Sequence, residues 1–134
     1  MKDPYLRILD ANYNRAKEAL RVAEDLARFF LNRRALALAY KKSRHDLTKI
    51  LLKMPVRYCD LLKSRDIFSD VGRKTPMKDK ASKTGWPDIM RSNIKRSQEA
   101  LRVLEEVSRV LFPKQARSLE DLRFRLYELE TKSF

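Results

Sequence analysis

Glycine is scarce in this chain of 134 residues, which contains only Gly72 and Gly85. Average usage of about 7% would give roughly nine glycines in a chain of this length. Phosphate-binding loops, the dinucleotide-binding fingerprint and β-proteins rich in tight turns all need glycine where the backbone has positive φ or approaches a ligand closely. The sequence therefore excludes these classes of protein.

Cysteine and histidine are nearly absent, since Cys59 and His45 are each the only residue of their type. A single cysteine cannot form an intramolecular disulfide, which excludes a disulfide-stapled secreted module and favours a reducing, cytoplasmic location. A single histidine leaves little material for histidine-based metal sites or catalytic triads. We expect Cys59 to be a packed thiol and His45 to lie on the solvent side of its helix.

Long hydrophobic runs are also missing. No stretch approaches 18 uncharged apolar residues, and the N-terminal sequence has no apolar segment of the kind found in signal peptides. We therefore expect a soluble protein that does not enter a membrane. The length suits a single domain, residues 1–134, and the many Leu, Ala, Arg, Lys and Glu residues are typical of amphipathic helices.

Positive charge is the main excess of the composition. Lysine and arginine number 31 against 18 acidic residues, which gives a net charge of +13 and an isoelectric point of about 10.1. Such a charge favours an anionic partner, whether nucleic acid, an acidic membrane surface or a phosphorylated metabolite. The alternative is that the basic residues only solvate helix faces.

An internal repeat organises the chain. Residues 8–31, ILDANYNRAKEALRVAEDLARFFL, recur 81 positions later as residues 89–112, IMRSNIKRSQEALRVLEEVSRVLF. A weaker match relates residues 40–51 to residues 119–130. The repeat predicts an all-α fold, a helical bundle built from two pseudo-symmetric helical hairpins that are joined by an irregular middle segment.

Apolar side chains at spacings of three and four predict two helices in each hairpin. Asp10 is the expected N-cap of the first helix, Pro55 ends the second, and Pro113 separates the third from the fourth. The expected ranges are 8–54 for the first repeat, 61–87 for the irregular segment and 88–130 for the second repeat. The irregular segment carries both glycines, and we expect a functional loop or lid there, with a plain connector as the alternative.

Asparagine and arginine recur at the apolar stripe of each hairpin. A helical wheel places Asn12 within the stripe, Arg15 at its edge and Arg44 at the margin of the partner helix, and the second repeat places Asn93, Arg96 and Arg123 in the same way. A desolvated guanidinium needs an anion or a carboxylate as its partner. Each hairpin is therefore predicted to direct one asparagine and two arginines toward a shared cavity that binds phosphate or carboxylate.

A structural interpretation of the same residues stays open. Glu18 and Glu99 lie three positions beyond Arg15 and Arg96, so they could form surface ion pairs with these arginines. In that case the asparagines could cap a kink in the helix or contact its backbone.

The irregular segment contains one acidic cluster, Asp66 and Asp70, with Arg65 before it and Gly72 after it. Mg²⁺ takes carboxylate oxygens and commonly shares them with substrate phosphates, so this cluster is a candidate metal site. Aspartates that form ordinary turns are the alternative.

Several motifs resemble the all-helical domain often fused ahead of bacterial thiamin-phosphate synthase: residues 8–31, SRHDL at 43–47, Arg65-Asp66, Asp70-Val71-Gly72, SNIKRSQEALRVLEEVSRV and LRFRLYELE. The resemblance spans nearly the whole chain. It implies an atypical hydroxymethylpyrimidine-phosphate kinase, which transfers the γ-phosphoryl group of ATP to 4-amino-2-methyl-5-hydroxymethylpyrimidine phosphate with the help of Mg²⁺.

The resemblance also implies a set of site residues, with arginines on phosphates and acidic groups on Mg²⁺ or the pyrimidine. Arg65, Asp66 and Asp70 are the implied catalytic residues, the two aspartates also being the candidate Mg²⁺ ligands. The implied substrate-binding residues are Asn12, Arg15, Glu18, Arg44, Asn93, Arg96, Glu99 and Arg123.

Two other functions stay open at this stage. One is a catalytically silent ligand-binding or assembly domain of thiamin metabolism. The other is a basic nucleic-acid-binding module, which we do not expect because zinc signatures, RNP-like strands and basic heptad regions are missing. The expected partners are the phosphorylated pyrimidine, ATP, thiamin-phosphate synthase and a second copy of the chain.

Overall fold

The computed structural model describes residues 3–74 and 82–134. These residues form helices and no strand, which confirms the all-α class. In chain order the elements are α1 (Pro4–Asp25), a π-helical turn (Leu26–Phe30), α2 (Arg34–Leu52), α3 (Tyr58–Ser64), α4 (Trp86–Leu111) and α5 (Pro113–Lys132).

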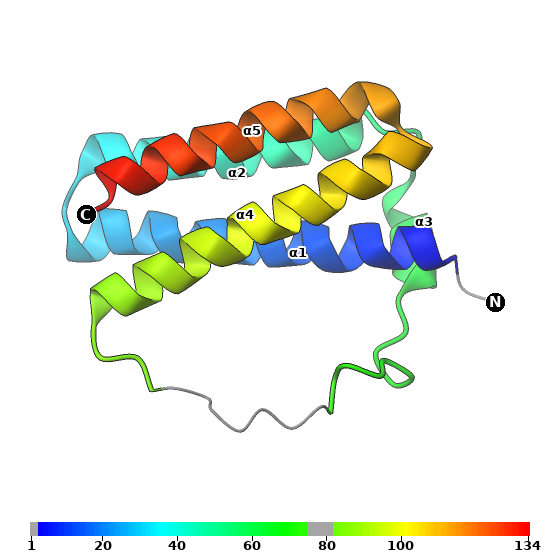
Figure 1. Cartoon of the computed structure of the whole chain (residues 1–134), viewed down its shortest axis with the longest axis horizontal. Helices are drawn as coiled ribbons and strands as arrows, with labels where there is room; N and C mark the ends of the chain where they lie inside the picture. The colour runs from blue at the N-terminus through cyan, green and yellow to red at the C-terminus, as the bar shows by residue number, and fades with distance from the viewer. Residues whose placement is uncertain (1–2, 75–81) are drawn as a thin grey trace.

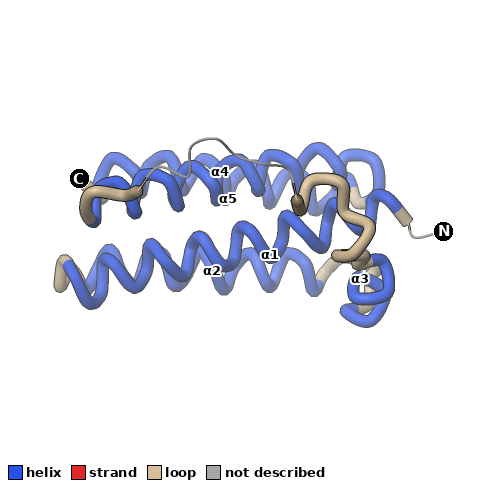
Figure 2. Tube along the Cα trace, turned by 90° about the horizontal axis from the view of Figure 1, so that it is seen from below, coloured by secondary structure: helices blue, strands red, loops and turns tan. Residues whose placement is uncertain are grey.

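The four long helices form a bundle of two hairpins. One layer holds α1 and α2, and the other holds α4 and α5 (Figure 2). Across the layers α1 packs against α4 and α2 packs against α5, while α3 contacts α1 at one end of the bundle (Figure 1). The described parts of the connection between α3 and α4 lie at opposite ends of the bundle, residues 65–74 next to α3 and residues 82–85 before the start of α4 (Figure 1).

Apolar residues at helical spacing fill the space between the layers. Ala16, Ala19, Leu20 and Ala23 of α1 are each at most 1% exposed. Small alanines let the α4 backbone approach closely, and each fully buried leucine contributes about 1.5–3 kcal/mol. No helix among residues 3–74 and 82–134 is long and apolar enough to cross a membrane.

The structure corrects the predicted start of the first helix. Asp3 is the N-cap, because its Oδ1 accepts hydrogen bonds from the N–H groups of Tyr5 at 2.9 Å and Leu6 at 3.1 Å. Pro4 occupies the first helical turn, where its missing N–H costs nothing. Asp10, the predicted cap, instead lies inside α1 and is only 5% exposed.

The connections agree only partly with the predicted boundaries. Asn32, with φ of 52°, adopts the left-handed conformation in the turn before α2, a place that glycine often takes. The irregular segment expected over 61–87 is helical at both ends, because α3 extends to Ser64 and α4 begins at Trp86. Leu61 explains the first difference, since it is 1% exposed and anchors α3 against the core. Residues 75–81 of the predicted lid lie outside the described residues.

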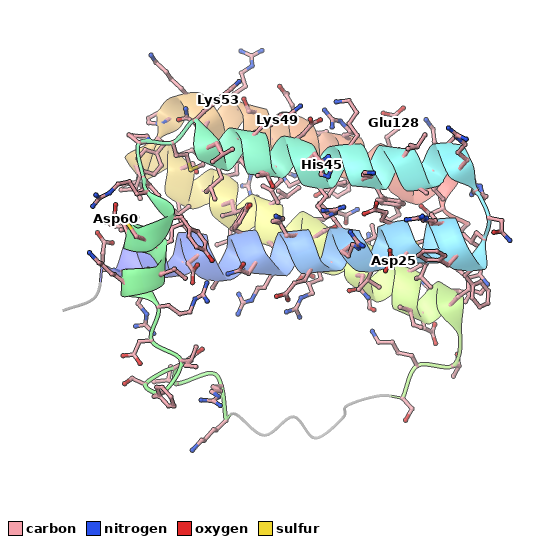
Figure 3. All side chains as sticks on the ribbon, turned by 180° about the vertical axis from the view of Figure 1, so that it is seen from behind. Asp25, His45, Lys49, Lys53, Asp60 and Glu128 are labelled. Carbon is pink, nitrogen blue, oxygen red and sulfur yellow. The ribbon has the colours of Figure 1, made fainter. Side chains whose placement is uncertain are left out.

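The exposure of His45 and of Cys59 can also be compared with the predictions. His45 is exposed on α2, in line with Lys49 and Lys53, as expected (Figure 3). Cys59 is exposed, so the prediction of a packed thiol is wrong. The short helix α3 buries only Leu61 and Ser64, and Cys59 falls on its other side.

Candidate functional site

A buried carboxylate joins the two helices of each hairpin at equivalent positions. In the first hairpin, Glu24 Oε2 accepts hydrogen bonds from Arg44 Nε at 3.1 Å and Nη2 at 3.0 Å. In the second, Glu105 Oε2 accepts from Arg123 Nε at 2.8 Å. The four side chains are at most 15% exposed. Arg44 and Arg123 are thus each paired with a glutamate of their own hairpin. This corrects the expectation that the two arginines point with the asparagines into a shared cavity.

The second of these carboxylates is the more strongly held. Glu105 Oε1 also accepts hydrogen bonds from Arg102 at 3.1 Å and Arg109 at 3.0 Å. Burial alone would raise the pKa of Glu105, but the hydrogen bonds from Arg123 and Arg109 bring that pKa below its ordinary value. The same contact with Glu105, together with the Tyr127 hydroxyl, raises the pKa of Arg123. This pair is therefore charged at neutral pH and joins α4 to α5. The predicted role of Arg44 and Arg123 in substrate binding stays a prediction.

The two asparagines bind the backbone of their own helices. Asn12 Nδ2 donates to the Ile8 carbonyl at 3.0 Å, and Asn93 Nδ2 donates to the Ile89 carbonyl at 2.9 Å. These contacts with the helix backbone agree with the structural interpretation of the two asparagines. In the first repeat the Asn12 amide oxygen also accepts a long hydrogen bond, 3.4 Å, from the exposed Arg15.

A pocket of about 600 Å³, here called the crossing pocket, opens where α1 meets α4. Its lining residues are Glu18, Ala19 and Val22 of α1, Lys83, and Ser92, Asn93, Lys95, Arg96 and Glu99 of α4. Four predicted site residues thus come together there, whereas Asn12 and Arg15 take the equivalent positions on α1 outside the pocket. Among residues 3–74 and 82–134, no ion pair joins Arg15 to Glu18 or Arg96 to Glu99, so the surface pairs of the alternative do not form.

Two cations of this pocket, Lys83 and Lys95, were not predicted from the sequence. Lys83 donates a hydrogen bond to Ser92 Oγ, which holds it beside α4. Lys95 lies 3.0 Å from Glu130 of α5. Neither lysine carries a sequence signal, because only the crossing of α1 and α4 brings them to the same pocket as Glu18.

The three residues predicted as catalytic lie on the segment that follows α3. Arg65 binds Asp10 of α1 with two hydrogen bonds of 2.7 and 2.8 Å, which raise the pKa of Arg65. Asp66 Oδ1 accepts from the Ser69 N–H at 3.0 Å, and Asp70 Oδ1 accepts from the Gly72 N–H at 2.9 Å. These contacts build turns and attach the segment to α1. None of the three residues lines the crossing pocket, so their predicted catalytic role stays a prediction.

Among the described residues, few carboxylates lie together where they could bind Mg²⁺. In the described part of the chain, no group of three or more His, Cys, Asp or Glu side chains is placed to hold a metal ion. Glu18 and Glu99 nevertheless line one pocket together with basic side chains. Mg²⁺ is commonly held by one or two carboxylates plus phosphates, so Glu18 and Glu99 are the two residues of this pocket that could serve as ligands.

Comparison with known proteins identifies the family of this chain. The model of the ThiD2 family matches residues 7–132. The chain belongs to the ThiD2 family. It is 39% identical over 125 residues to a thiamine-phosphate synthase of Synechocystis sp., covering 93% of this chain and 35% of that protein.

Two further relatives give the same result. A thiamine-phosphate synthase of Rhodopirellula baltica is 38% identical over 131 residues, with 95% of this chain and 34% of that protein covered. One from Synechococcus sp. (strain CC9311) is 39% identical over 126 residues, with 94% and 34% covered. This ThiD2 chain therefore spans about a third of the length of the curated relatives it matches. No solved structure matches it.

Proposed function

We propose that this ThiD2 chain is a kinase of thiamin biosynthesis that transfers the γ-phosphoryl group of ATP to 4-amino-2-methyl-5-hydroxymethylpyrimidine phosphate. The observation that carries the proposal is the crossing pocket, where Lys83, Lys95 and Arg96 gather beside Glu18 and Glu99. The family supports the pathway, because the relatives are named thiamine-phosphate synthase and this chain accounts for only a third of their length.

The pocket suits phosphoryl transfer without a glycine-rich loop. The reaction needs mainly positioning and neutralisation of phosphate charge. Arg96 can bind two phosphate oxygens with its planar guanidinium, whereas Lys83 and Lys95 act as point charges. Glu99 would hold Mg²⁺, which neutralises charge between the phosphates. In this proposal, side chains of the crossing pocket bind the phosphates that a glycine-rich loop binds in other kinases.

The acceptor explains why no strong general base is needed. A phosphate monoester has its second pKa near 6, so it is largely dianionic at neutral pH. One of its oxygens forms a bond to the γ-phosphorus, the bond from that phosphorus to the β–γ bridging oxygen breaks, and ADP leaves. The products are a pyrimidine diphosphate and ADP, and the attacking oxygen has no proton to lose.

ADP release from Mg²⁺ and ATP tests the proposal directly. The purified chain is incubated with the pyrimidine monophosphate, with the free pyrimidine alcohol or without acceptor. We expect turnover with the monophosphate and only background release without an acceptor. A folded sample that is silent with all three would refute the kinase, and retained binding would then identify a silent binding domain.

A matched pair of arginine variants locates the reaction. Arg96→Met should lower kcat/KM by about 10- to 150-fold, the effect of losing one charge-assisted hydrogen bond of roughly 1.5–3 kcal/mol. Arg91→Met is the control, because Arg91 lies on the same helix, is 59% exposed and does not line the pocket. Equal activity of both variants would place the phosphates elsewhere.

A further inference from the structure

A second pocket, here called the tyrosine pocket, lies between α1, α2 and α3 and has a volume of about 480 Å³. Its lining residues are Tyr13, Asn14, Lys17 and Glu18 of α1, Thr48, Leu51 and Leu52 of α2, Val56, and Tyr58 and Leu61 of α3. Glu18 also lines the crossing pocket, so the two hollows adjoin at one carboxylate. A ligand that fills both pockets must pass Glu18.

The tyrosine pocket has the character of a site for a flat ring. Leu51, Val56 and the buried Leu61 provide apolar walls, and Tyr58, which is 67% exposed, lies beside them. Small-molecule sites commonly combine such walls with a few polar groups in volumes of about 300–1,000 Å³. Heterocycles stack on exposed aromatic side chains in the same way that unpaired bases do.

The polar groups of the pocket are mostly oriented already. The Tyr13 hydroxyl is hydrogen-bonded to Thr48 at 3.2 Å, and Lys17 Nζ lies 5.4 Å from the centre of the Tyr13 ring. Asn14 Nδ2 donates to the Asp10 carbonyl at 3.0 Å, which leaves its amide oxygen as an acceptor. The Glu18 side chain has no hydrogen bond or ion pair to any other residue of the described ranges 3–74 and 82–134. Its carboxylate is therefore available to accept hydrogen bonds from a ligand.

The second repeat does not reproduce this pocket. Lys95 stands there in place of Asn14, and Glu130 stands in place of Leu51. Lys95 Nζ lies 3.0 Å from Glu130 Oε1, so an ion pair connects the positions that border the pocket in the first repeat. The ring-binding character thus belongs to one side of the pseudo-twofold axis only.

We propose that the tyrosine pocket binds the aminopyrimidine ring of the phosphorylated substrate, with Tyr58 against the ring face and Glu18 accepting a hydrogen bond from the exocyclic amino group. This inference rests on the proposed function for the identity of the substrate. In that substrate the amino group on ring carbon 4 neighbours carbon 5, which carries the phosphorylated hydroxymethyl arm. A carboxylate at the boundary between the pockets therefore meets the amino group while the phosphate enters the crossing pocket.

Binding measured by calorimetry without ATP tests the inference independently of catalysis. The wild-type chain is titrated with the pyrimidine monophosphate and compared with Tyr58→Ala and Glu18→Gln. Tyr58→Ala should weaken binding by about 5- to 150-fold, the range found when a stacking aromatic is removed. Tyr5→Ala is the control, because Tyr5 is 44% exposed on α1 and lines neither pocket. All of these side chains are exposed, so the variants should fold.

An analogue in which hydrogen replaces the 4-amino group tests the role of Glu18. The wild type should prefer the amino compound, and Glu18→Gln should lose most of this preference. Binding that depends on Tyr58 and Glu18 in a chain without ATP turnover would support the ring site and refute the kinase. Turnover together with wild-type affinity in both variants would support the kinase and overturn the ring site. Absence of binding by the wild type would also overturn the ring site.

Discussion

Replacing the buried carboxylate of the second hairpin should destabilise the protein strongly. The Glu105 side chain is 0% exposed and contacts Arg102, Arg109 and Arg123, and Arg123 itself is only 11% exposed. Glu105→Gln keeps the shape of the side chain but removes its charge. The Arg123 guanidinium then stays buried without an anion, because the half-exposed Arg102 and Arg109 can reach solvent and Arg123 cannot.

The expected loss follows from the cost of an uncompensated buried charge. Breaking a buried ion pair by removing one partner typically costs about 3–5 kcal/mol. In a domain of this size 1 kcal/mol lowers the melting temperature by roughly 3–4 °C, so we expect a decrease of about 10–20 °C. Urea denaturation followed by circular dichroism measures the free energy directly.

Glu106→Gln is the matched control. Glu106 is the next residue, its side chain is 50% exposed, and it pairs with the same Arg102 and Arg109 on the helix surface. Surface ion pairs of this kind contribute about 0–1 kcal/mol. A loss below about 1 kcal/mol for Glu105→Gln, or an equal loss for both variants, would refute the structural role of the buried pair. The double variant Glu105→Leu/Arg123→Met should be more stable than Glu105→Gln, because it leaves no buried charge.

Three further outcomes follow from the described contacts. The folded pKa of Glu105 lies below its ordinary value of 4.5, so the stability that its charge provides is complete above pH 4.5 and is lost as the pH falls through the folded pKa. Between about pH 6 and pH 3 the melting temperature should therefore decrease more for the wild type than for Glu105→Gln. Asp3→Ala should cost about 1 kcal/mol through loss of the N-cap, and an unchanged urea midpoint would contradict the capping contact. Asp10→Asn should weaken the attachment of Arg65 and speed amide hydrogen exchange in α3, while exchange in α5 stays the same.

The repeat was sufficient to predict the bundle, and the apolar stripe was sufficient to predict that Asn12 is buried. The helical wheel could not predict which anion binds Arg44. An internal carboxylate and a bound phosphate both compensate for the desolvation of a buried guanidinium. A signal was present, since Glu24 and Glu105 occupy matching positions in the repeat, just as Arg44 and Arg123 do. Matching positions for both charges favour an internal pair.

Other parts of the site depend on contacts between distant segments. Lys83 precedes α4, and its position beside Glu18 follows only from the crossing of α1 and α4. The same holds for Tyr58, which reaches the tyrosine pocket because Leu61 anchors α3 against the core. The N-cap was a different kind of error. Asp10 fits the local cap pattern, but Asp3 followed by Pro4 fits it better and extends the helix.

The two repeats agree where they support the fold and differ where they line the pockets. Both keep the buried glutamate–arginine pair, which holds each hairpin together. Around it the first repeat has Leu51 where the second has Glu130. Leu51 lines the tyrosine pocket, whereas Glu130 forms an ion pair with Lys95. Two identical halves would offer the same site twice, as suits two like ligands. The proposed kinase reaction would bind a nucleotide and a smaller acceptor in distinct places, and pockets that differ between two similar halves are compatible with that proposal.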